Sequence, residues 1–165
     1  MSLPAKTRPS HKAGGRVGSS FAKELLKTSQ HTITALTRAG SKSALPEGVR
    51  AVPVDYEDDD SIVSALQGQE FLIITLSVTA PKDLHERVVK AAAKAGVRWI
   101  MPNIFGGDAM NEGLRDNELQ GPLYAGPLSH VKEAGVAVSP LRFSRTSDSL
   151  VSTLNIFWIC LFSRR

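Results

Sequence analysis

FLIITLSVTAPKDLHERVVKAAAKAGVRWIM, residues 71–101, predicts a strand, a helix and a second strand in succession. The apolar run 71–76 has the length of a strand that is buried on both faces. In residues 82–95, Leu84, Val88 and Ala92 recur at helical spacing, and Gly96 follows as a stop signal. Residues 97–101 form the next strand. A helix that joins two strands in this way is typical of a parallel sheet.

The same alternation extends in both directions from this stretch. The periodicity predicts helices over 17–28, 58–68 and 123–134, and strands over 31–37, 49–54 and 136–141. This order predicts an α/β fold with a parallel sheet covered by helices. Parallel sheets bind ligands beyond the carboxyl ends of their strands. Functional residues should therefore follow Thr37, Val54, Leu76 and Met101.

Length and composition limit the class of protein. The 165 residues suit one domain, and 42% hydrophobic with 22% charged residues argues against disorder and against a multi-span membrane protein. The single cysteine, Cys160, excludes an intramolecular disulfide and suits a reducing compartment, so we expect a cytoplasmic protein. Much of the net charge of +4 lies at the two ends of the chain, which weakens any inference of an anionic partner.

The two ends differ from the middle. Residues 1–13 are basic and nearly devoid of apolar side chains, so we expect a disordered tail there. Residues 144–165 include a short apolar segment, well below the roughly 20 residues that a helix needs to cross a bilayer. We therefore expect one domain over 14–143, an apolar C-terminal tail outside the fold, and no membrane partner.

A glycine-rich turn opens the first helix. Gly15 and Gly18 have the spacing of the last two glycines of a dinucleotide-binding turn, in which the helix N-terminus faces a pyrophosphate. Lys12 stands where the first glycine should be, and no apolar strand precedes the turn. A flexible basic loop is the equally open alternative.

Arg38 follows the next predicted strand, about 20 residues beyond Gly18, where dinucleotide folds place the residue that reads the adenosine ribose. An acid at this place binds the 2′-hydroxyl of NAD, whereas an arginine accommodates the 2′-phosphate of NADP. Arg38 and Lys42 lie in a segment without an acid, and a guanidinium binds phosphate with two hydrogen bonds. The segment predicts NADP(H), with a solvated basic turn as the alternative.

The stretches GGRVGSSFAKELL, TALTRAGSK, PVDYEDDDSIVSALQGQEFLIITL and VRWIMPNIFGGD together resemble the NmrA-like family, especially its fungal members. These are atypical short-chain dehydrogenase relatives that include isoflavone-reductase-like proteins. The resemblance covers residues 14–141 and implies a Rossmann-like, doubly wound sheet that binds NADP(H).

The resemblance also implies site residues. It places Phe105 beside a substrate and Asp55 with Tyr56 at the adenine edge, although an acid after a strand equally often only turns the chain. The implied cofactor-binding residues are Gly15, Arg16, Val17, Gly18, Arg38, Lys42, Asp55, Tyr56, Leu76, Ser77, Pro102 and Asn103.

The chain departs from the family pattern at both ends. The family begins with an apolar strand at the centre of the sheet and continues beyond the position of Phe143 into a substrate-binding region. Neither is recognisable here, so we expect a sheet that lacks its first, central strand, in a shortened or altered gene product. The loss would expose the edges of both neighbouring strands.

No complete catalytic set is evident. Short-chain reductases pair a tyrosine with a lysine four residues later, but neither Tyr56 nor Tyr124 has one. Tyr124 stands where isoflavone-reductase-like enzymes carry a lysine, and it is either a substitute acid or a structural tyrosine. The histidines His11, His31, His85 and His130 lack metal-ligand spacing, and no nucleic-acid-binding pattern is present.

Three functions remain open. The first is NADP(H) binding for redox sensing or for interaction with a regulatory protein. The second is NADPH-dependent reduction of a small organic substrate. The third is a shortened product that neither binds nor catalyses.

Overall fold

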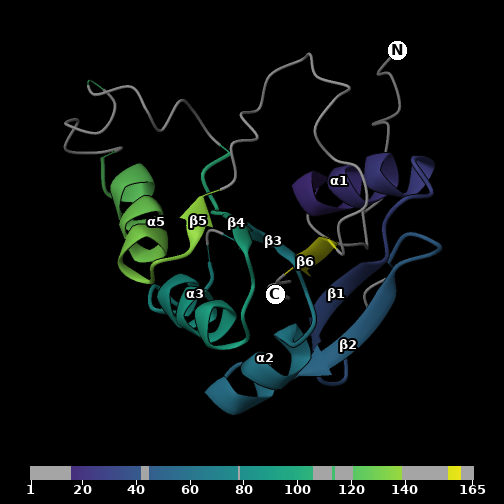
Figure 1. Ribbon diagram of the computed structural model, residues 1–165, viewed down its shortest axis with the longest axis horizontal. Helices are drawn as coiled ribbons and strands as arrows, with labels where there is room; N and C mark the ends of the chain where they lie inside the picture. The colour runs from purple at the N-terminus through teal and green to yellow at the C-terminus, as the bar shows by residue number, and fades with distance from the viewer. Residues whose placement is uncertain are drawn as a thin grey trace, which may run out of the picture.

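The computed structural model describes residues 16–41, 45–77, 79–105, 113, 121–138 and 156–160 (Figure 1). Helices and strands alternate as the periodicity predicted, with ends that differ by a few residues. The residues 1–13, Gly15 and Lys42 lie outside the described part. The elements are α1 (Arg16–Lys27), β1 (Ile33–Arg38), β2 (Arg50–Val54), α2 (Asp59–Leu66), β3 (Phe71–Thr75), α3 (Leu84–Lys94), β4 (Trp99–Met101), α5 (Gly121–Glu133), β5 (Ala137–Val138) and β6 (Ile156–Cys160).

The strands form one six-stranded sheet in the order β2-β1-β6-β3-β4-β5. Every neighbouring pair is parallel, which confirms the predicted parallel sheet. β3 is buried along its whole length, as the apolar run 71–76 predicted. Among the described residues, none of the helices combines the length and the apolar character needed to cross a membrane.

β6 occupies the centre of the sheet, between β1 and β3 (Figure 1). Ile156 lies opposite Ile33 on one side and Phe71 on the other, and Cys160 lies opposite Thr75. The sequence predicted an empty position here and an apolar tail outside the fold, and the structure differs on both points. An empty central position would leave backbone N–H and C=O groups of β1 and β3 unpaired. An apolar segment rich in β-branched and aromatic residues favours a strand, and here it pairs with both of these strands.

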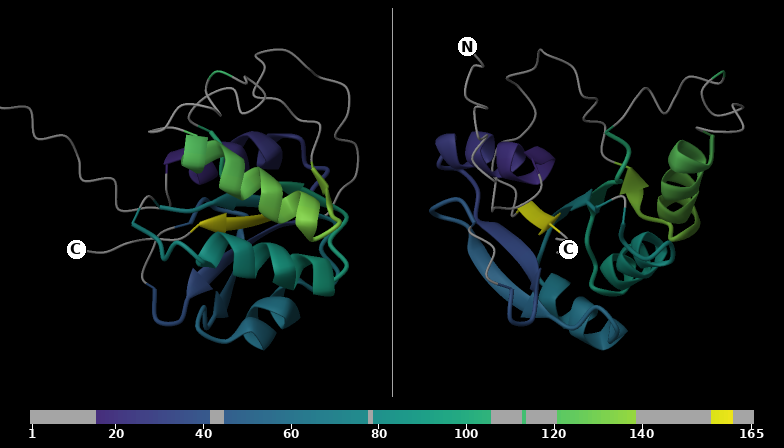
Figure 2. Two further views of the ribbon diagram at one scale, coloured as in Figure 1. Left: turned by 90° about the vertical axis from the view of Figure 1, so that its left-hand side faces the viewer. Right: turned by 180° about the vertical axis from the view of Figure 1, so that it is seen from behind.

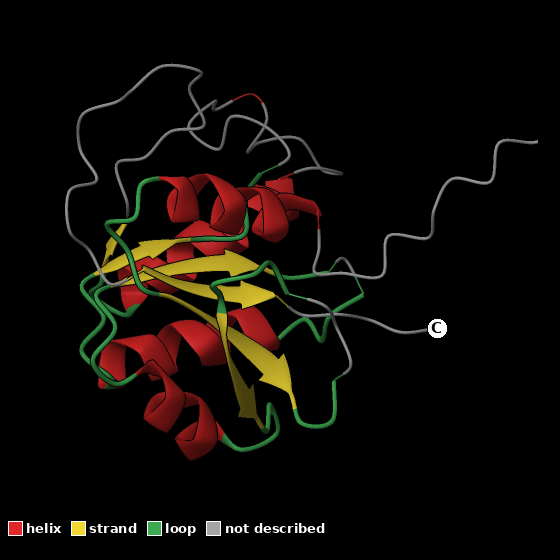
Figure 3. Ribbon diagram, turned by 90° about the vertical axis from the view of Figure 1, so that its right-hand side faces the viewer, coloured by secondary structure: helices red, strands yellow, loops and turns green. Residues whose placement is uncertain are grey.

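Helices cover the two faces of the sheet unequally. α1 lies on one face, and α2 and α3 lie on the other, with α5 next to α3 beyond β5 (Figures 1 and 2). Figure 3 shows the strands as a layer between the two groups of helices. On the face of α2 and α3, one cluster of buried side chains includes Leu36, Ile62, Leu72, Val88 and Ile100, together with Val131 of α5.

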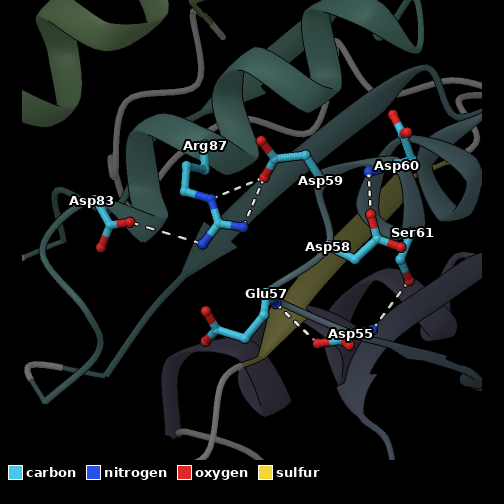
Figure 4. A network of polar contacts seen from close by, with 8 residues as sticks. All are labelled: Asp55, Glu57, Asp58, Asp59, Asp60, Ser61, Asp83 and Arg87. Carbon is cyan, nitrogen blue, oxygen red and sulfur yellow. Dashed lines mark hydrogen bonds and ion pairs between the residues drawn. The ribbon is translucent and has the colours of Figure 1, made fainter.

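α2 and α3 are linked by an ion pair where each helix begins (Figure 4). The guanidinium of Arg87 contacts Asp59 Oδ1 through Nη2 at 2.8 Å and through Nε at 2.9 Å. Asp58 caps α2 by accepting a hydrogen bond from the backbone N–H of Asp60 at 3.0 Å. Because the carboxylate of Asp59 is half-exposed, solvent screens the pair and limits its contribution to stability.

Candidate functional site

The carboxyl ends of the strands bring several predicted residues to one edge of the sheet. Because all strands are parallel, the segments after Arg38, Val54, Thr75 and Met101 all emerge at this edge. α1 is joined to the start of β1 by the short segment 28–32, so α1 runs back along the sheet and begins at the same edge. The carboxyl edge therefore combines a helix N-terminus with the ends of four strands.

The first turn of α1 contains three of the predicted residues. Gly18 is buried, whereas Val17 is 39% exposed although it is apolar. The backbone of Arg16 begins the helix, and its side chain lies outside the described part, as does Gly15. The first N–H groups of a helix have no partner within the helix and carry a partial positive charge, so this end can hold an anion.

Arg38 is the last residue of β1 and opens a tight turn. The backbone N–H of Ser41 donates to the carbonyl of Arg38 at 2.9 Å. Gly40 has a φ of +74°, the left-handed value that a type II turn requires at this position. Arg38, Ala39, Gly40 and Ser41 are exposed, and none of them carries a negative charge. The guanidinium of Arg38 is thus displayed at the carboxyl edge on the strand that pairs with β6.

Asp55 and Tyr56 diverge after β2. The carboxylate of Asp55 is exposed and accepts a hydrogen bond from the backbone N–H of Glu57 at 2.9 Å (Figure 4). The backbone N–H of Asp55 donates to Ser61 Oγ at 3.1 Å. Tyr56 is 6% exposed and belongs to the large buried cluster. The structure thus gives Asp55 the turn role that was the alternative to adenine binding, and the cofactor role of both residues stays a prediction.

Leu76 and Ser77 follow β3 and are half-buried. Ser77 Oγ lies 2.9 Å from Thr79 Oγ1 and accepts a hydrogen bond from the backbone N–H of Thr79 at 3.2 Å. The carbonyl of Leu76 accepts a hydrogen bond from Asn103 Nδ2 at 3.3 Å. The segments after β3 and β4 are therefore tied together at the predicted nicotinamide end.

Pro102, Asn103 and Phe105 follow β4. The backbone N–H of Ile104 donates to the carbonyl of Pro102 at 2.8 Å, which places Asn103 at the centre of a three-residue turn. The ring of Phe105 packs on Phe21 of α1, with the centroids 5.6 Å apart and the planes tilted by 54°. Phe105, predicted to face a substrate, thus connects the end of β4 to α1.

Two histidines meet behind Asn103, and the sequence did not indicate their proximity. His85 of α3 is 6% exposed, and its Nδ1 lies 3.2 Å from Nδ1 of His130 on α5. Nε2 of His85 faces the backbone N–H of Asn103 at 3.4 Å. Burial, with a smaller effect of the neighbouring His130, lowers the pKa of His85 from 6.5 to about 4. His85 is consequently neutral at physiological pH.

Spacing in the sequence does not reveal this pair, because 45 residues separate the two histidines. The sequence contained only an indirect signal for the pair. Each histidine lies in a predicted helix, and one predicted strand, residues 97–101, separates these two helices in the sequence. Tyr124 lies in α5 as expected, but its side chain is outside the described part, so its role as an acid stays a prediction. Within the described ranges, the structure contains no group of three or more residues suited to a metal ion.

Comparison with known proteins identifies the family of this chain. The sequence model of a family described as NAD(P)H-binding matches residues 13–125. The chain belongs to this NAD(P)H-binding family. The match begins next to the glycine turn and extends through β4, so it includes most of the carboxyl edge described above. It also confirms the resemblance to NmrA-like, atypical short-chain dehydrogenase relatives.

Two curated relatives are oxidoreductases. The oxidoreductase aprR of Aspergillus flavus is 35% identical over 100 residues, which make up 60% of this chain and 33% of the relative. Quinone oxidoreductase 2 of Escherichia coli is 31% identical over 114 residues, which make up 66% of this chain and 40% of the relative. The matched region thus spans well under half the length of either relative.

Solved structures show the same architecture. The NADPH-dependent quinone oxidoreductase of Escherichia coli, solved with NADPH, matches with a TM-score of 0.57 and 26% identity over 75% of this chain and 44% of that chain. The Citrobacter sp. triphenylmethane reductase, solved with NADP(H), matches with a TM-score of 0.52 and 23% identity over the same shares of both chains. The fold is therefore a Rossmann-like α/β fold with a parallel sheet.

Proposed function

We propose that this NAD(P)H-binding chain prefers NADP(H) and that cofactor binding serves redox sensing or regulation. The pyrophosphate would lie at the N-terminus of α1, where Gly18 and Val17 are found. The 2′-phosphate would lie at Arg38, and the nicotinamide half would extend toward Leu76 and Asn103.

The placement of Arg38 is the observation that carries this proposal. Its guanidinium is exposed at the end of β1, and the turn from Arg38 to Ser41 contains no carboxylate that would bind a ribose 2′-hydroxyl. In the same turn, Gly40 has no side chain and Ser41 has a small one. A phosphate group could therefore approach Arg38 with two charge-assisted hydrogen bonds and no repulsion from that turn.

A reductase is the second candidate, with hydride transfer from NADPH to a small organic substrate. Asn103 offers a polar group at the predicted nicotinamide end, and Phe105 offers an apolar surface beside α1. The two relatives, an oxidoreductase and a quinone oxidoreductase, favour this chemistry. Quinones are accordingly the first substrates to try.

Isothermal titration calorimetry with NADPH and NADH tests the preference. We expect Arg38→Ala to weaken NADPH binding roughly 10- to 140-fold, because a hydrogen-bonded charge contributes about 1.5–3 kcal/mol. NADH affinity should change little. Arg50→Ala is the matched control, because Arg50 is also exposed but lies at the opposite end of its strand. It should leave both affinities unchanged.

Three outcomes separate the candidate functions. Equal affinity for NADPH and NADH, or an equal effect of the two arginine variants, would contradict the proposed preference. Oxidation of NADPH in the presence of a quinone would favour the reductase over a sensor. A chain that binds neither nucleotide would have neither proposed function.

A further inference from the structure

The contacts of His85 define where its protons lie. Because the backbone N–H of Asn103 can only donate, Nε2 of His85 must accept that hydrogen bond and carry no proton. Neutral His85 then carries its proton on Nδ1 and donates it to Nδ1 of His130, 3.2 Å away. His130 must accept at Nδ1 and therefore carries its own proton on Nε2. The direction of each hydrogen bond follows from the single donor at Asn103.

This chain of hydrogen bonds ends at the candidate cofactor site. The backbone N–H of Asn103 donates to His85, and the side-chain amide of Asn103 donates to the carbonyl of Leu76. α3, α5 and the ends of β3 and β4 thus converge on one three-residue turn. Both ring nitrogens of this buried histidine form hydrogen bonds. The two bonds restrain the imidazole ring, and the ring in turn holds its partners in position.

We propose that His85, supported by His130, is a positioning residue that holds the Asn103 turn at the nicotinamide end of the site. The inference rests on the proposed cofactor binding, because the turn matters for function only if a dinucleotide occupies this edge. His85 itself is too deeply buried to contact the cofactor, so its effect passes through Asn103.

The charged groups around the pair lie on α3 and α5. The carboxylate of Glu86 interacts with His130, and this interaction contributes to lowering the pKa of Glu86 after the larger effect of Lys90. Lys90 pairs with Glu86 at 2.6 Å and also interacts with Glu133 of α5. The turn after β4 contributes the uncharged Asn103. Lys90 thus engages Glu86 by direct contact.

Nitrogen-15 NMR of the whole chain tests the hydrogen-bond pattern without any cofactor. Long-range proton–nitrogen spectra should show His85 protonated at Nδ1 and His130 protonated at Nε2 at neutral pH. His85 should stay neutral until the pH approaches about 4. A His85 side chain protonated at Nε2 at neutral pH would overturn the proposal, because that nitrogen could not accept from Asn103.

Two substitutions at one position separate positioning from packing. Glutamine can place an amide oxygen near the site of Nε2 and still accept from Asn103, whereas asparagine reaches only the site of Nδ1. We expect His85→Asn to weaken NADPH binding roughly three- to tenfold and His85→Gln to stay within about twofold of the native chain. Val89→Ala, a buried packing change on the same helix, should lower the melting temperature without changing affinity.

These experiments test the proposed cofactor binding and the positioning role of His85 separately. If the native chain binds no dinucleotide, the proposed function fails, while the NMR spectra still decide the hydrogen-bond pattern. If it binds NADPH and both His85 variants behave like Val89→Ala, the positioning role is wrong and the proposed function stands. Equal weakening by the asparagine and glutamine variants would also overturn the role, because only one of them loses the Asn103 contact.

Discussion

On the face covered by α2, α3 and α5, the buried side chains form one continuous cluster that runs from Leu36 on β1 to Val131 on α5. On the face covered by α1, the buried side chains that the structure describes form two clusters, one around Ala35 on β1 and one around Ile73 on β3, and the side chains of β6 between these strands lie outside the described part. The same strands supply both faces, and different helices cover them (Figure 3).

The two clusters on the α1 face lie on either side of β6, because β6 separates β1 from β3 in the sheet. α1 bridges the two clusters, since Leu25 packs against both of them. The α1 face also carries the N-terminus of the helix and Phe105, which belong to the candidate site. Another candidate residue, Tyr56, belongs to the large cluster on the opposite face.

Removal of β6 should have the largest effect on this arrangement. A chain that ends at Asn155 loses the strand that pairs with both β1 and β3, so backbone groups along two strands become unpaired. Such a loss exceeds the total stability of about 5–15 kcal/mol that is typical of one domain. We expect no cooperative thermal transition by circular dichroism.

A chain that ends at Cys160 is the matched control, because it retains β6, and it should melt cooperatively. A synthetic peptide of residues 155–165, added to the shorter chain, should restore the transition. Equal melting curves for the two truncated chains would show that β6 does not hold the sheet together.

Two adjacent residues on β3 allow the packing of the two faces of the sheet to be compared directly. Leu72 and Ile73 are both buried, at 0% and 2% exposure, but Leu72 belongs to the continuous cluster and Ile73 to a small one. Truncation to alanine costs about 2–5 kcal/mol in protein cores, and more where the surroundings cannot relax. We expect both variants to lose about 2–5 kcal/mol, and the difference between the two losses compares how far the side chains of each face can relax.

Urea unfolding of the two variants measures this difference, provided that the denaturant dependence of the unfolding free energy stays the same in both. Two equal losses would mean that the α1 face is as well packed as the other face.

The sequence predicted the elements well because their signals are local. The period of Leu84, Val88 and Ala92 identifies α3 without knowledge of any other part of the chain. The Asp55 turn is also local, since its carboxylate binds the N–H of Glu57, two residues away. The family resemblance rested on the same local stretches and is confirmed.

The position of β6 and the histidine pair escaped prediction because both depend on distant contacts. An apolar segment such as residues 156–160 can be recognised as a strand, but its place in the sheet depends on which edges are left unpaired. His85 and His130 meet only because α3 packs on α5, and helix packing is not encoded in the spacing of two residues. For the same reason, Arg38 could be placed at the end of a strand, but that this strand pairs with β6 could not be predicted.

A pH-dependent effect concerns His85, a buried polar residue of α3. Its pKa is about 4 in the folded chain and 6.5 in the unfolded chain. Between these values the unfolded chain binds a proton that the folded chain does not, so stability falls as the pH decreases through this window. The total loss from this group is at most about 3 kcal/mol, and it stops growing below pH 4.

Urea unfolding of the native chain and of His85→Gln between pH 7 and pH 4 isolates this contribution. Carboxylates also become protonated in this range, but they do so in both chains and cancel in the difference between the two unfolding free energies. Since glutamine does not titrate, the native chain should lose stability relative to the variant as the pH falls below 6.5. A difference that stays constant with pH would mean that His85 is solvated in the folded chain, which would also remove the reason for its fixed contact with Asn103.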